Sequence, residues 1–366
     1  MRTYCKGLEI REPDVWLAYD AWLKAPAGRK NSWRIDGEHG STQALVQEIA
    51  CEIRERRLRL RPIKRYVHRE PTNGKLRTIG VESVKQQICD YVAVTALAPL
   101  LEARIGFWQV SSVKGKGQLM AAHAMRRWAH QGGYYAHLDV RKCYPSISGA
   151  LVIRILRKYV KSSDIIYLCE TLLSTYDGGL EIGSFFSLRM AQLVLSFGYH
   201  EVESMHKTRR GASKALVAHQ LWYADDVFLF SQDKRDLRSA ARKLQRYLDD
   251  ELGLMVKPWK VCRIGDDEPI DALGYMVRPS RTTIRANIFL RACRAFRAFK
   301  RRRTLTSARR VTSYWGYFRH SDSFSVVMRN GFDNVMRHAR RMISAAGKEQ
   351  HGSNIDFGIP ATAGAV

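Results

Sequence analysis

Three aspartates stand within strongly apolar stretches of this 366-residue sequence. Asp225 and Asp226 are adjacent in 221-LWYADDVFLF-230, and Asp139 lies near the end of 134-YYAHLDV-140. Desolvating a carboxylate is so costly that such residues need a counter-charge nearby. The doublet alone is equally consistent with an Asp-Asp turn in a surface hairpin, because short motifs of this kind are common.

Two strands lying side by side would bring Asp139 to the doublet. Three close carboxylates do not all stay ionised without a cation, and oxygen ligands of this type suit Mg²⁺. A pair of Mg²⁺ ions about 4 Å apart serves in-line displacement at phosphorus. We therefore expect a site for phosphoryl transfer that uses two Mg²⁺ ions, with Mn²⁺ as an alternative.

Basic residues dominate the composition. There are 61 Lys and Arg against 35 Asp and Glu, so the formal net charge is +26. This surplus indicates nucleic acid, an anionic membrane, or a simple effect on solubility. The surplus is concentrated between Arg281 and Ala345, where Asp322 and Asp333 are the only acids. Nucleic acid fits best, because a basic face this dense repels itself unless phosphates lie against it.

Composition also narrows the class of protein. Hydrophobic residues make up 45% of the chain, which argues against wholesale disorder. No run of about 18 apolar residues is present, so we expect no membrane partner. The first residues lack an apolar signal core, so we expect a cytoplasmic protein. The seven cysteines form no CxxC pair, which favours reduced thiols over disulfides or a zinc site.

The periodicity of apolar residues predicts a mixed α+β fold, without the regular alternation of a parallel doubly wound sheet. A Thr-Asn-Gly turn at 72–74 predicts a hairpin with two basic arms. The predicted helices cover residue 43 to a point before Pro62, 82–105, 118–131, 150–160, 164–176, part of 180–200, 233–252 and 285–303. The predicted strands cover 134–140, 221–230 and 270–277.

The order of motifs resembles that of the reverse transcriptases, specifically the prokaryotic branch of group II intron-like, diversity-generating and defence-associated enzymes. The resemblance covers about residues 60–320. Its motifs are 74-GKLRTIG-80, 139-DVRKCYPSI-147, 181-EIGSFFSLRMAQLVLS-196, 223-YADD-226, Lys260 and 273-LGY-275. It implies a right-hand polymerase fold with fingers, an antiparallel palm sheet and a helical thumb.

The resemblance also implies a division of the chain into regions. These are an N-terminal helical extension at 1–60, a fingers-like region at 61–132 and 150–180, a palm at 133–149 and 181–278, a basic helical thumb at 279–345, and a flexible tail at 346–366.

By the same resemblance, Asp139 and Asp225 would bridge the metals and the carbonyl of Val140 would add a ligand. Asp226 would lie nearer the primer terminus. Tyr144 would lie under the sugar of the incoming nucleotide and leave no room for a 2′-hydroxyl. An ordinary core aromatic would give the same pattern at this position.

Lys75 and Arg77 would clamp the nucleotide triphosphate, since basic groups neutralise charge that develops during phosphoryl transfer. A solvated basic hairpin is the plainer interpretation. Lys260 would neutralise the leaving pyrophosphate, although a single lysine in so basic a chain is a weak signal.

Ile182 and Gly183 would contact the nucleotide where many relatives carry Gln-Gly. An aliphatic residue at position 182 resembles the diversity-generating group, in which it accompanies loose copying. Leu188 departs from that group, which usually carries Gln there.

Two basic segments are candidates for nucleic-acid binding. Glycines in the loop 114–118 would let backbone amides approach phosphates, although a flexible loop is the simpler alternative. In 285–303 apolar residues fall on one helical face and arginines on the other, and the aromatic residues of 312–324 are expected mainly in a thumb core. The candidate contacts are Lys114, Gly115, Lys116, Gly117, Leu273, Gly274, Tyr275, Arg294, Arg297, Arg301 and Arg302.

The resemblance implies an RNA-directed DNA polymerase that adds deoxynucleotides to a primer 3′ end, copying a dedicated structured non-coding RNA in bacterial anti-phage defence. Alternatives are a low-fidelity diversity-generating enzyme, template-independent or protein-primed DNA synthesis, and a nucleic-acid-binding protein without turnover. The implied partners are an RNA template, a DNA primer or product and deoxynucleotides, with an accessory protein or oligomer left open.

Overall fold

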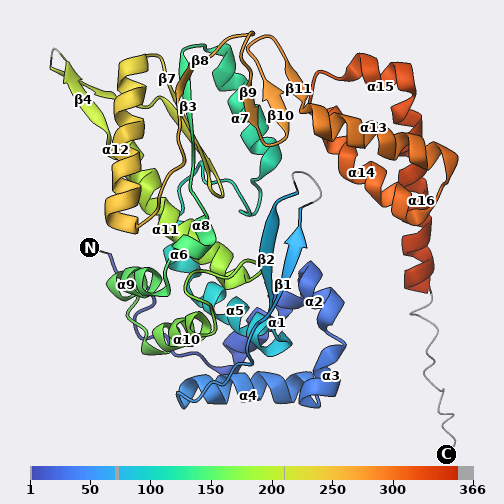
Figure 1. The fold of residues 1–366 in the computed structure, drawn as a ribbon. Helices are drawn as coiled ribbons and strands as arrows, with labels where there is room; N and C mark the ends of the chain where they lie inside the picture. The colour runs from blue at the N-terminus through green and yellow to red at the C-terminus, as the bar shows by residue number, and fades with distance from the viewer. Residues whose placement is uncertain (1, 71–73, 210, 353–366) are drawn as a thin grey trace, which may run out of the picture. The chain divides into compact units, whose positions relative to one another are not determined.

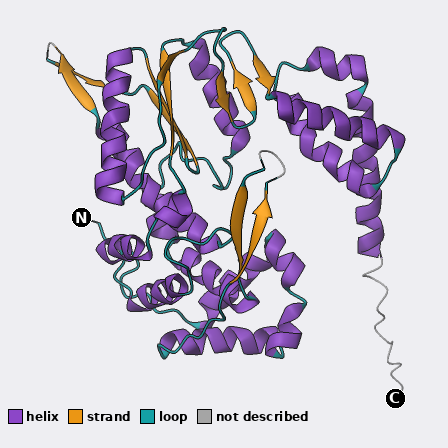
Figure 2. Cartoon of the chain, in the orientation of Figure 1, coloured by secondary structure: helices purple, strands orange, loops and turns teal. Residues whose placement is uncertain are grey.

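The computed structural model describes residues 2–70, 74–209 and 211–352 (Figure 1). The chain divides into two compact units. Unit 1 comprises Met1–Gly117 and Gly133–Cys262, and unit 2 comprises Gln118–Gly132 and Arg263–Val366. Helices form most of both units, and the strands form small sheets with antiparallel pairing (Figure 2). The predicted mixed class is therefore confirmed.

The largest sheet of unit 1 has the strand order β6-β7-β3-β8. Helix α12, which packs against β3 and β7, buries an apolar stripe that includes Leu237, Leu244 and Leu248. This spacing places the leucines on one helical face, which lies against the sheet (Figure 1). The bounds are β3 (Tyr134–Asp139), β6 (His219–Tyr223), β7 (Asp226–Ser231), β8 (Val261–Arg263) and α12 (Lys234–Leu252).

Helices α5 and α11 run through the core of unit 1. Helix α5 packs against α1, α10 and α11, so the N-terminal helices share one hydrophobic core with the sheet. The bounds are α1 (Glu12–Lys24), α2 (Pro26–Asn31), α3 (Arg34–His39), α4 (Thr42–Arg54), α5 (Val84–Ala96), α6 (Ala98–Arg104), α8 (Cys143–Ser146), α9 (Gly149–Tyr159), α10 (Ser163–Ser174) and α11 (Phe185–Ser204).

Two hairpins extend from unit 1. Strands β1 (Lys64–Arg69) and β2 (Leu76–Val81) pair in antiparallel register, with Arg69 opposite Leu76. The hairpin predicted at this place is present, but residues 72 and 73 of its turn lie outside the described residues. Strands β4 (His206–Arg209) and β5 (Ala212–Ala215) form the second hairpin.

Unit 2 combines a three-stranded sheet of order β11-β10-β9 with five helices in its described part. Its core is aromatic: the Phe296 ring lies 5.5 Å from Phe318 and 4.5 Å from Phe332. This confirms a packing role for part of the aromatic segment 312–324. The bounds are α7 (Gln118–His130), β9 (Ile270–Ala272), β10 (Tyr275–Val277), β11 (Thr282–Ile284), α13 (Ala286–Arg301), α14 (Leu305–Arg319), α15 (Phe324–Asn330) and α16 (Phe332–Gly352).

Helix α4 ends at Arg54, before Pro62 as the sequence predicts, because Arg56 adopts a positive φ of 57° that stops the helix. Three other expected elements differ from the structure. The strand expected over 270–277 is two strands, β9 and β10, because Leu273 and Gly274 have positive φ values and turn the chain. The strand expected over 221–230 is a hairpin, because Ala224 has φ 54° and turns the chain. The start of the tail expected at 346–366 is helical, since α16 runs to Gly352.

All seven cysteines are free, and five of them are buried, as their scatter predicted. Within the described residues, no helix combines the length and apolar character needed to cross a membrane.

Candidate active site

The three aspartates come together at the ends of the central strands of unit 1. Asp225 lies in the turn between β6 and β7, and Asp226 is the first residue of β7. Antiparallel pairing places Asp139 of β3 directly opposite Asp226. The amide of Val140 donates to the Asp225 carbonyl at 3.1 Å, which fixes the turn against the end of β3. The juxtaposition expected from the sequence is present.

Two of the carboxylates face a basic side chain. Lys257 Nζ donates to Asp139 Oδ2 at 2.7 Å, and His137 Nε2 lies 2.7 Å from Asp226 Oδ1. The His137 ring is stacked on Phe228 with a centroid separation of 4.3 Å, which orients it toward Asp226. Lys257 thus balances the charge of Asp139, and His137 gives Asp226 a hydrogen-bonding partner.

The carboxylate of Asp225 has a different environment. Burial raises its pKa, and the neighbouring Asp226 and Asp139 raise it further, whereas Arg77 opposes them. An acid in such a place stays ionised more readily once a cation is close.

The residues present fit a hard divalent cation. Asp139 Oδ1 is buried and has no hydrogen-bond partner, so one carboxylate oxygen is unsatisfied. The available donors are oxygens, which Mg²⁺ prefers. Within the described residues, no group of three or more metal-binding side chains is already arranged around a point. Lys257 occupies the second oxygen of Asp139, so cation binding there would require this lysine to move.

The sequence analysis missed Lys257 and His137. His137 precedes Asp139 by two residues and so lies on the same face of β3. The two-residue periodicity of a strand could therefore have indicated it from the sequence. Lys257 gives no such signal: it reaches the site because Val256 pairs with Val140. Lys260, the lysine chosen from the sequence, is exposed and lies with Lys257 in a groove beside α12.

Tyr144 lies beside the aspartates on the short helix α8. Together with Trp222, Ala224 and Gln192 it lines a small, mainly apolar pocket. Burial raises the pKa of Tyr144 to about 12, with smaller contributions from Cys143 and Asp225. The ring is therefore half-buried in packing and also adjacent to the Asp225 turn.

The β1–β2 hairpin and the segment 181–183 pack against each other. The Gly80 amide of β2 donates to the Ile182 carbonyl at 2.8 Å. Gly183 has φ 115°, and a Cβ atom there would lie 2.6 Å from the Gly80 carbonyl oxygen. Arg65 donates two hydrogen bonds to Glu181, at 2.9 and 2.7 Å. The β1–β2 hairpin is therefore fixed to the segment 181–183.

The two basic residues of this hairpin differ in their surroundings. Arg77 is half-buried, pairs with Glu70, and contributes to the electrostatic environment of Asp225. Lys75 is exposed. Arg77 is thus placed to act at the aspartates, whereas Lys75 faces solvent.

Glu82 and Asp90 form a second acidic pair, and Asp90 contacts residues that follow the segment 181–183. Asp90 Oδ2 accepts hydrogen bonds from Ser184 Oγ at 2.7 Å and from the Phe186 amide at 2.9 Å, at the start of α11. Burial raises the pKa of Glu82 to about 9, and burial also raises the pKa of Asp90 to about 6. The pair anchors the first turn of α11, immediately after Gly183. No motif in the sequence indicated it.

The glycine-rich loop 114–117 is anchored through Lys116. Its ammonium donates to the Phe107 carbonyl at 2.5 Å and lies 4.5 Å from the centroid of the Phe107 ring. Burial lowers the pKa of Lys116. Gly115 and Gly117 have positive φ values of 76° and 128°, and Lys114 is exposed. The loop is thus more constrained than a plain flexible connection.

The segment 273–275 forms the turn between β9 and β10 in unit 2. Leu273 and Gly274 have φ values of 54° and 86°. Gln118 Nε2 donates to the Leu273 carbonyl at 2.6 Å and to Tyr317 Oη at 3.0 Å. Tyr275 is buried, and its ring lies 5.3 Å from that of Tyr317. Its ring is therefore part of the packing of unit 2.

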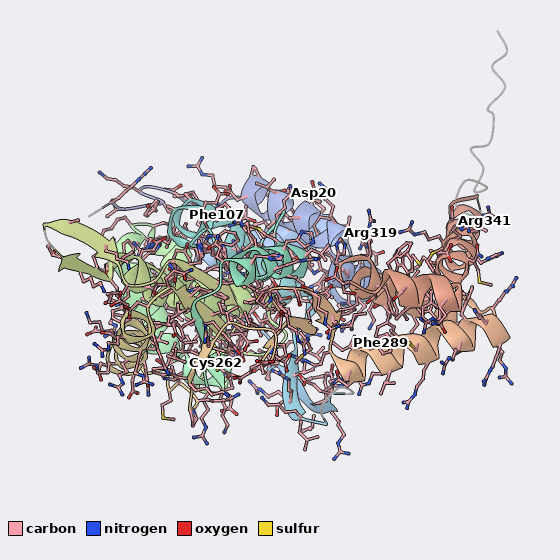
Figure 3. All side chains as sticks on the ribbon, turned by 90° about the horizontal axis from the view of Figure 1, so that it is seen from above. Asp20, Phe107, Cys262, Phe289, Arg319 and Arg341 are labelled. Carbon is pink, nitrogen blue, oxygen red and sulfur yellow. The ribbon has the colours of Figure 1, made fainter. Side chains whose placement is uncertain are left out.

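Helix α13 has the two faces predicted for it. Phe296 and Phe299 are buried in the core of unit 2, whereas the candidate arginines are exposed. Figure 3, which labels Arg319 and Arg341, shows nitrogen-ended side chains projecting from the helices of this unit. The exposed candidates are Arg294, Arg297, Arg301 and Arg302.

Comparison with known proteins adds one family match. Residues 67–277 match the family model described as "Reverse transcriptase (RNA-dependent DNA polymerase)". A curated relative, the "Putative COX1/OXI3 intron 1 protein" of Saccharomyces cerevisiae, is 19% identical over 318 residues, which is 72% of this chain and 38% of the relative. The chain thus spans well under half the length of that relative. The matched range contains all three aspartates and the pocket beside Tyr144.

Proposed function

Since the chain belongs to the reverse transcriptase family, we propose that it is an RNA-directed DNA polymerase that adds deoxynucleotides to the 3′ end of a primer. The pairing of Asp139 with Asp226 across β3 and β7, with Asp225 in the adjoining turn, carries this proposal. Such a set of carboxylates at one edge of a sheet suits phosphoryl transfer assisted by divalent cations.

Asp139 and Asp225 would hold two Mg²⁺ ions, or Mn²⁺ in their place, together with the carbonyl of Val140. Bound cations would lower the pKa of the attacking hydroxyl and would stabilise the charge on the transferred phosphate. Asp226, held by His137, faces the primer terminus and completes the acidic edge.

Lys257 balances the charge of Asp139 and is in direct contact with the site. We assign to it, with Lys260, the neutralisation of the departing pyrophosphate. A mobile ammonium in contact with a site carboxylate moves to phosphate when the charge there grows.

The incoming nucleotide would lie between the β1–β2 hairpin, the segment 181–183 and α8. Lys75 and Arg77 would neutralise its phosphates, and Ile182 and Gly183 would form the backbone surface beside its base. Tyr144 would contact the sugar and exclude a 2′-hydroxyl. The packing of Gly80 against Gly183 supports this arrangement, because it joins the β1–β2 hairpin and the segment 181–183 into one surface.

For the template and primer, each unit has candidate contacts of its own, and the fold we propose for the chain is the right-hand polymerase fold of fingers, palm and thumb. In this interpretation unit 1 supplies the loop Lys114, Gly115, Lys116 and Gly117. Unit 2 supplies the turn Leu273, Gly274 and Tyr275 and the exposed arginines of α13. The exposure of these arginines supports the proposal, since phosphate contacts need accessible basic groups.

For the biological role we propose that the enzyme copies a dedicated structured RNA in bacterial anti-phage defence. The aliphatic Ile182 supports either this role or a low-fidelity, diversity-generating one, and Leu188 favours defence.

The test is primer extension by the purified chain with Mg²⁺ and four deoxynucleotides, using an RNA template, a DNA template and no template. Extension on RNA that disappears in an Asp225→Ala/Asp226→Ala variant is the expected result. Extension without template would replace the proposal with template-independent or protein-primed synthesis. Absence of product even with co-purifying RNA retained would indicate a nucleic-acid-binding protein without turnover.

A further inference from the structure

The outward face of α12 carries a regular row of arginines. Arg235, Arg238, Arg242 and Arg246 are all exposed, opposite the leucines that pack on the sheet. We call these four residues the α12 basic face. Residues four apart on a helix are separated by about 6 Å along its axis. This spacing is comparable to that of successive phosphates along a nucleic-acid strand.

No ion pair involves the α12 basic face in the described part of the chain. None of its four arginines forms an ion pair or a side-chain hydrogen bond there, whereas Asp236 of the same helix is bonded by Lys207. Four unpaired guanidinium groups in a row repel one another. Their arrangement is therefore better explained by an external polyanion than by stability of the fold.

The order of charges along α12 supports the same conclusion. Asp233 caps the helix, and Lys207 neutralises Asp236, so the remaining charges of its N-terminal half are basic. Its last residues include Asp249, Asp250 and Glu251, with no basic residue in the last turn. The C-terminal acids oppose the helix dipole, which favours bases near that end, whereas Asp233 and Asp236 at the N-terminus agree with it. Between these acidic ends the exposed arginines make a strongly positive segment.

The α12 basic face continues into a groove that leads to the active site. The groove has a volume of about 540 Å³ and is lined by Arg238, Arg242, Gln245 and residues 256–261. Trp259 is half-buried there, and its Nε1 donates to Gln245 Oε1 at 2.8 Å. Lys257 belongs to the same groove and contacts Asp139. A strand lying in the groove would therefore come within reach of the catalytic edge.

We propose that the α12 basic face and this groove bind the phosphate backbone of a single-stranded RNA segment flanking the copied region of the same RNA. The inference rests on the proposed function for the identity of the polyanion as RNA. On α12 itself, Ser239 and Gln245 lie between the arginines, so the exposed helix face has no apolar side chain to insert into a membrane. Phosphate contacts by exposed arginines and an adjacent indole ring suit a single strand.

The test compares two full-length variants that lose the same charge. The first replaces the α12 basic face: Arg235→Gln, Arg238→Gln, Arg242→Gln and Arg246→Gln. The matched control replaces four exposed lysines elsewhere in unit 1: Lys6→Gln, Lys24→Gln, Lys30→Gln and Lys161→Gln. Circular dichroism verifies that both variants fold, and all eight side chains are exposed.

The probes are a blunt RNA template–DNA primer duplex and the same duplex with an oligouridine extension of about 16 nucleotides. Fluorescence anisotropy gives the Kd of each between about 50 and 200 mM KCl. The extension should tighten binding to the wild-type chain and to the control. The α12 variant should lose this gain, on the order of 10²-fold near 0.1 M salt, with a salt slope smaller by about 3. Its binding and extension of the blunt duplex should be unchanged.

Equal losses in both variants would overturn the proposal, since charge alone would then explain binding. An extension that adds no affinity to the wild-type chain would overturn it as well. The same gain from an oligodeoxythymidine extension, or α12-dependent binding of anionic vesicles without a gain from RNA, would reject the assignment to RNA. If the wild-type chain extends no primer but the α12-dependent gain in affinity persists, the proposed polymerase activity is wrong, whereas the proposed RNA-binding surface is supported.

Discussion

Unit 1 gathers carboxylates in two places and gives them opposite environments. The three aspartates at the strand ends are half-buried, and Lys257 and His137 contact two of them. Glu82 and Asp90 are buried, and within the described residues no basic side chain contacts either. The first group remains available to a cation, whereas the second retains a proton. Exposure and the nearest charge, rather than the number of acids, decide which chemistry a cluster performs.

The largest predicted effect is on primer extension, which should depend on the three aspartates and not on Glu82. Asp139→Asn should reduce primer extension by at least ~10³-fold, because it removes a proposed cation ligand at the reacting phosphate. Glu82→Gln, which keeps the shape of a protonated acid, should retain activity within about tenfold, an effect of about 1.4 kcal/mol. Rates of single-nucleotide addition measure both. Similar losses in the two variants would show that the buried acid takes part in the reaction.

The close packing of Gly183 against β2 should be sensitive to the addition of one methyl group. Gly183→Ala should lower the free energy of unfolding by about 3 kcal/mol, because its Cβ would meet the Gly80 carbonyl at 2.6 Å and φ is 115°. Gly178→Ala is the matched control: φ is also positive, but nothing lies within 4 Å of its Cβ. It should cost only about 1 kcal/mol. Urea denaturation measures the difference, and equal costs would mean that the contact with β2 yields without penalty.

The proton of the buried pair should appear in the pH dependence of stability. The pKa of Glu82 is about 9 in the folded chain, whereas the pKa of the free side chain is 4.5. Unfolding therefore releases a proton between these values, and the free energy of unfolding falls as pH rises through this window. The slope is at most about 1.4 kcal/mol per pH unit for one proton.

Glu82→Gln should flatten this slope, and the exposed Glu251→Gln should leave it unchanged. Urea denaturation between pH 5 and 9 measures both variants, a range set by the two pKa values of Glu82. An unaltered slope in Glu82→Gln would place the released proton on another group.

The smallest effect concerns the lysine that covers a site aspartate. Lys257→Met should tighten Mg²⁺ binding by up to about fivefold, because a partly exposed ion pair contributes no more than about 1 kcal/mol and competes with the cation. Isothermal titration calorimetry measures the affinity. Lys260→Met serves for comparison and should leave it unchanged. Weaker Mg²⁺ binding in Lys257→Met would mean that the lysine orders the site instead of competing for it.

Much of the acidic site was predictable, because its signals are local. Asp139 and Asp225 stand in apolar segments that can be recognised within ten residues, and β3 forms where the sequence predicts. Helix α13 likewise follows its apolar periodicity. These predictions succeeded because each depends on residues close together in the chain.

The parts that were missed depend on pairing between distant segments. Lys257 meets Asp139 only because Val256 pairs with Val140. Asp90 looks like an ordinary helical residue until α11 packs against α5 and brings Ser184 to it. No local pattern encodes such contacts, so neither the partner lysine nor the buried pair could be found from the sequence.

The division of the chain between the units has a consequence for the order of events during synthesis on the ribosome. Helix α7 belongs to unit 2, yet the other segments of that unit begin only at Arg263, after the whole second part of unit 1. Its buried face, which includes Met125 and Trp128, packs with β10. At usual elongation rates that face waits on the order of ten seconds for its partner strand. During this interval unit 1 can fold while α7 still lacks its partner strand, which is the step where we expect a chaperone to act.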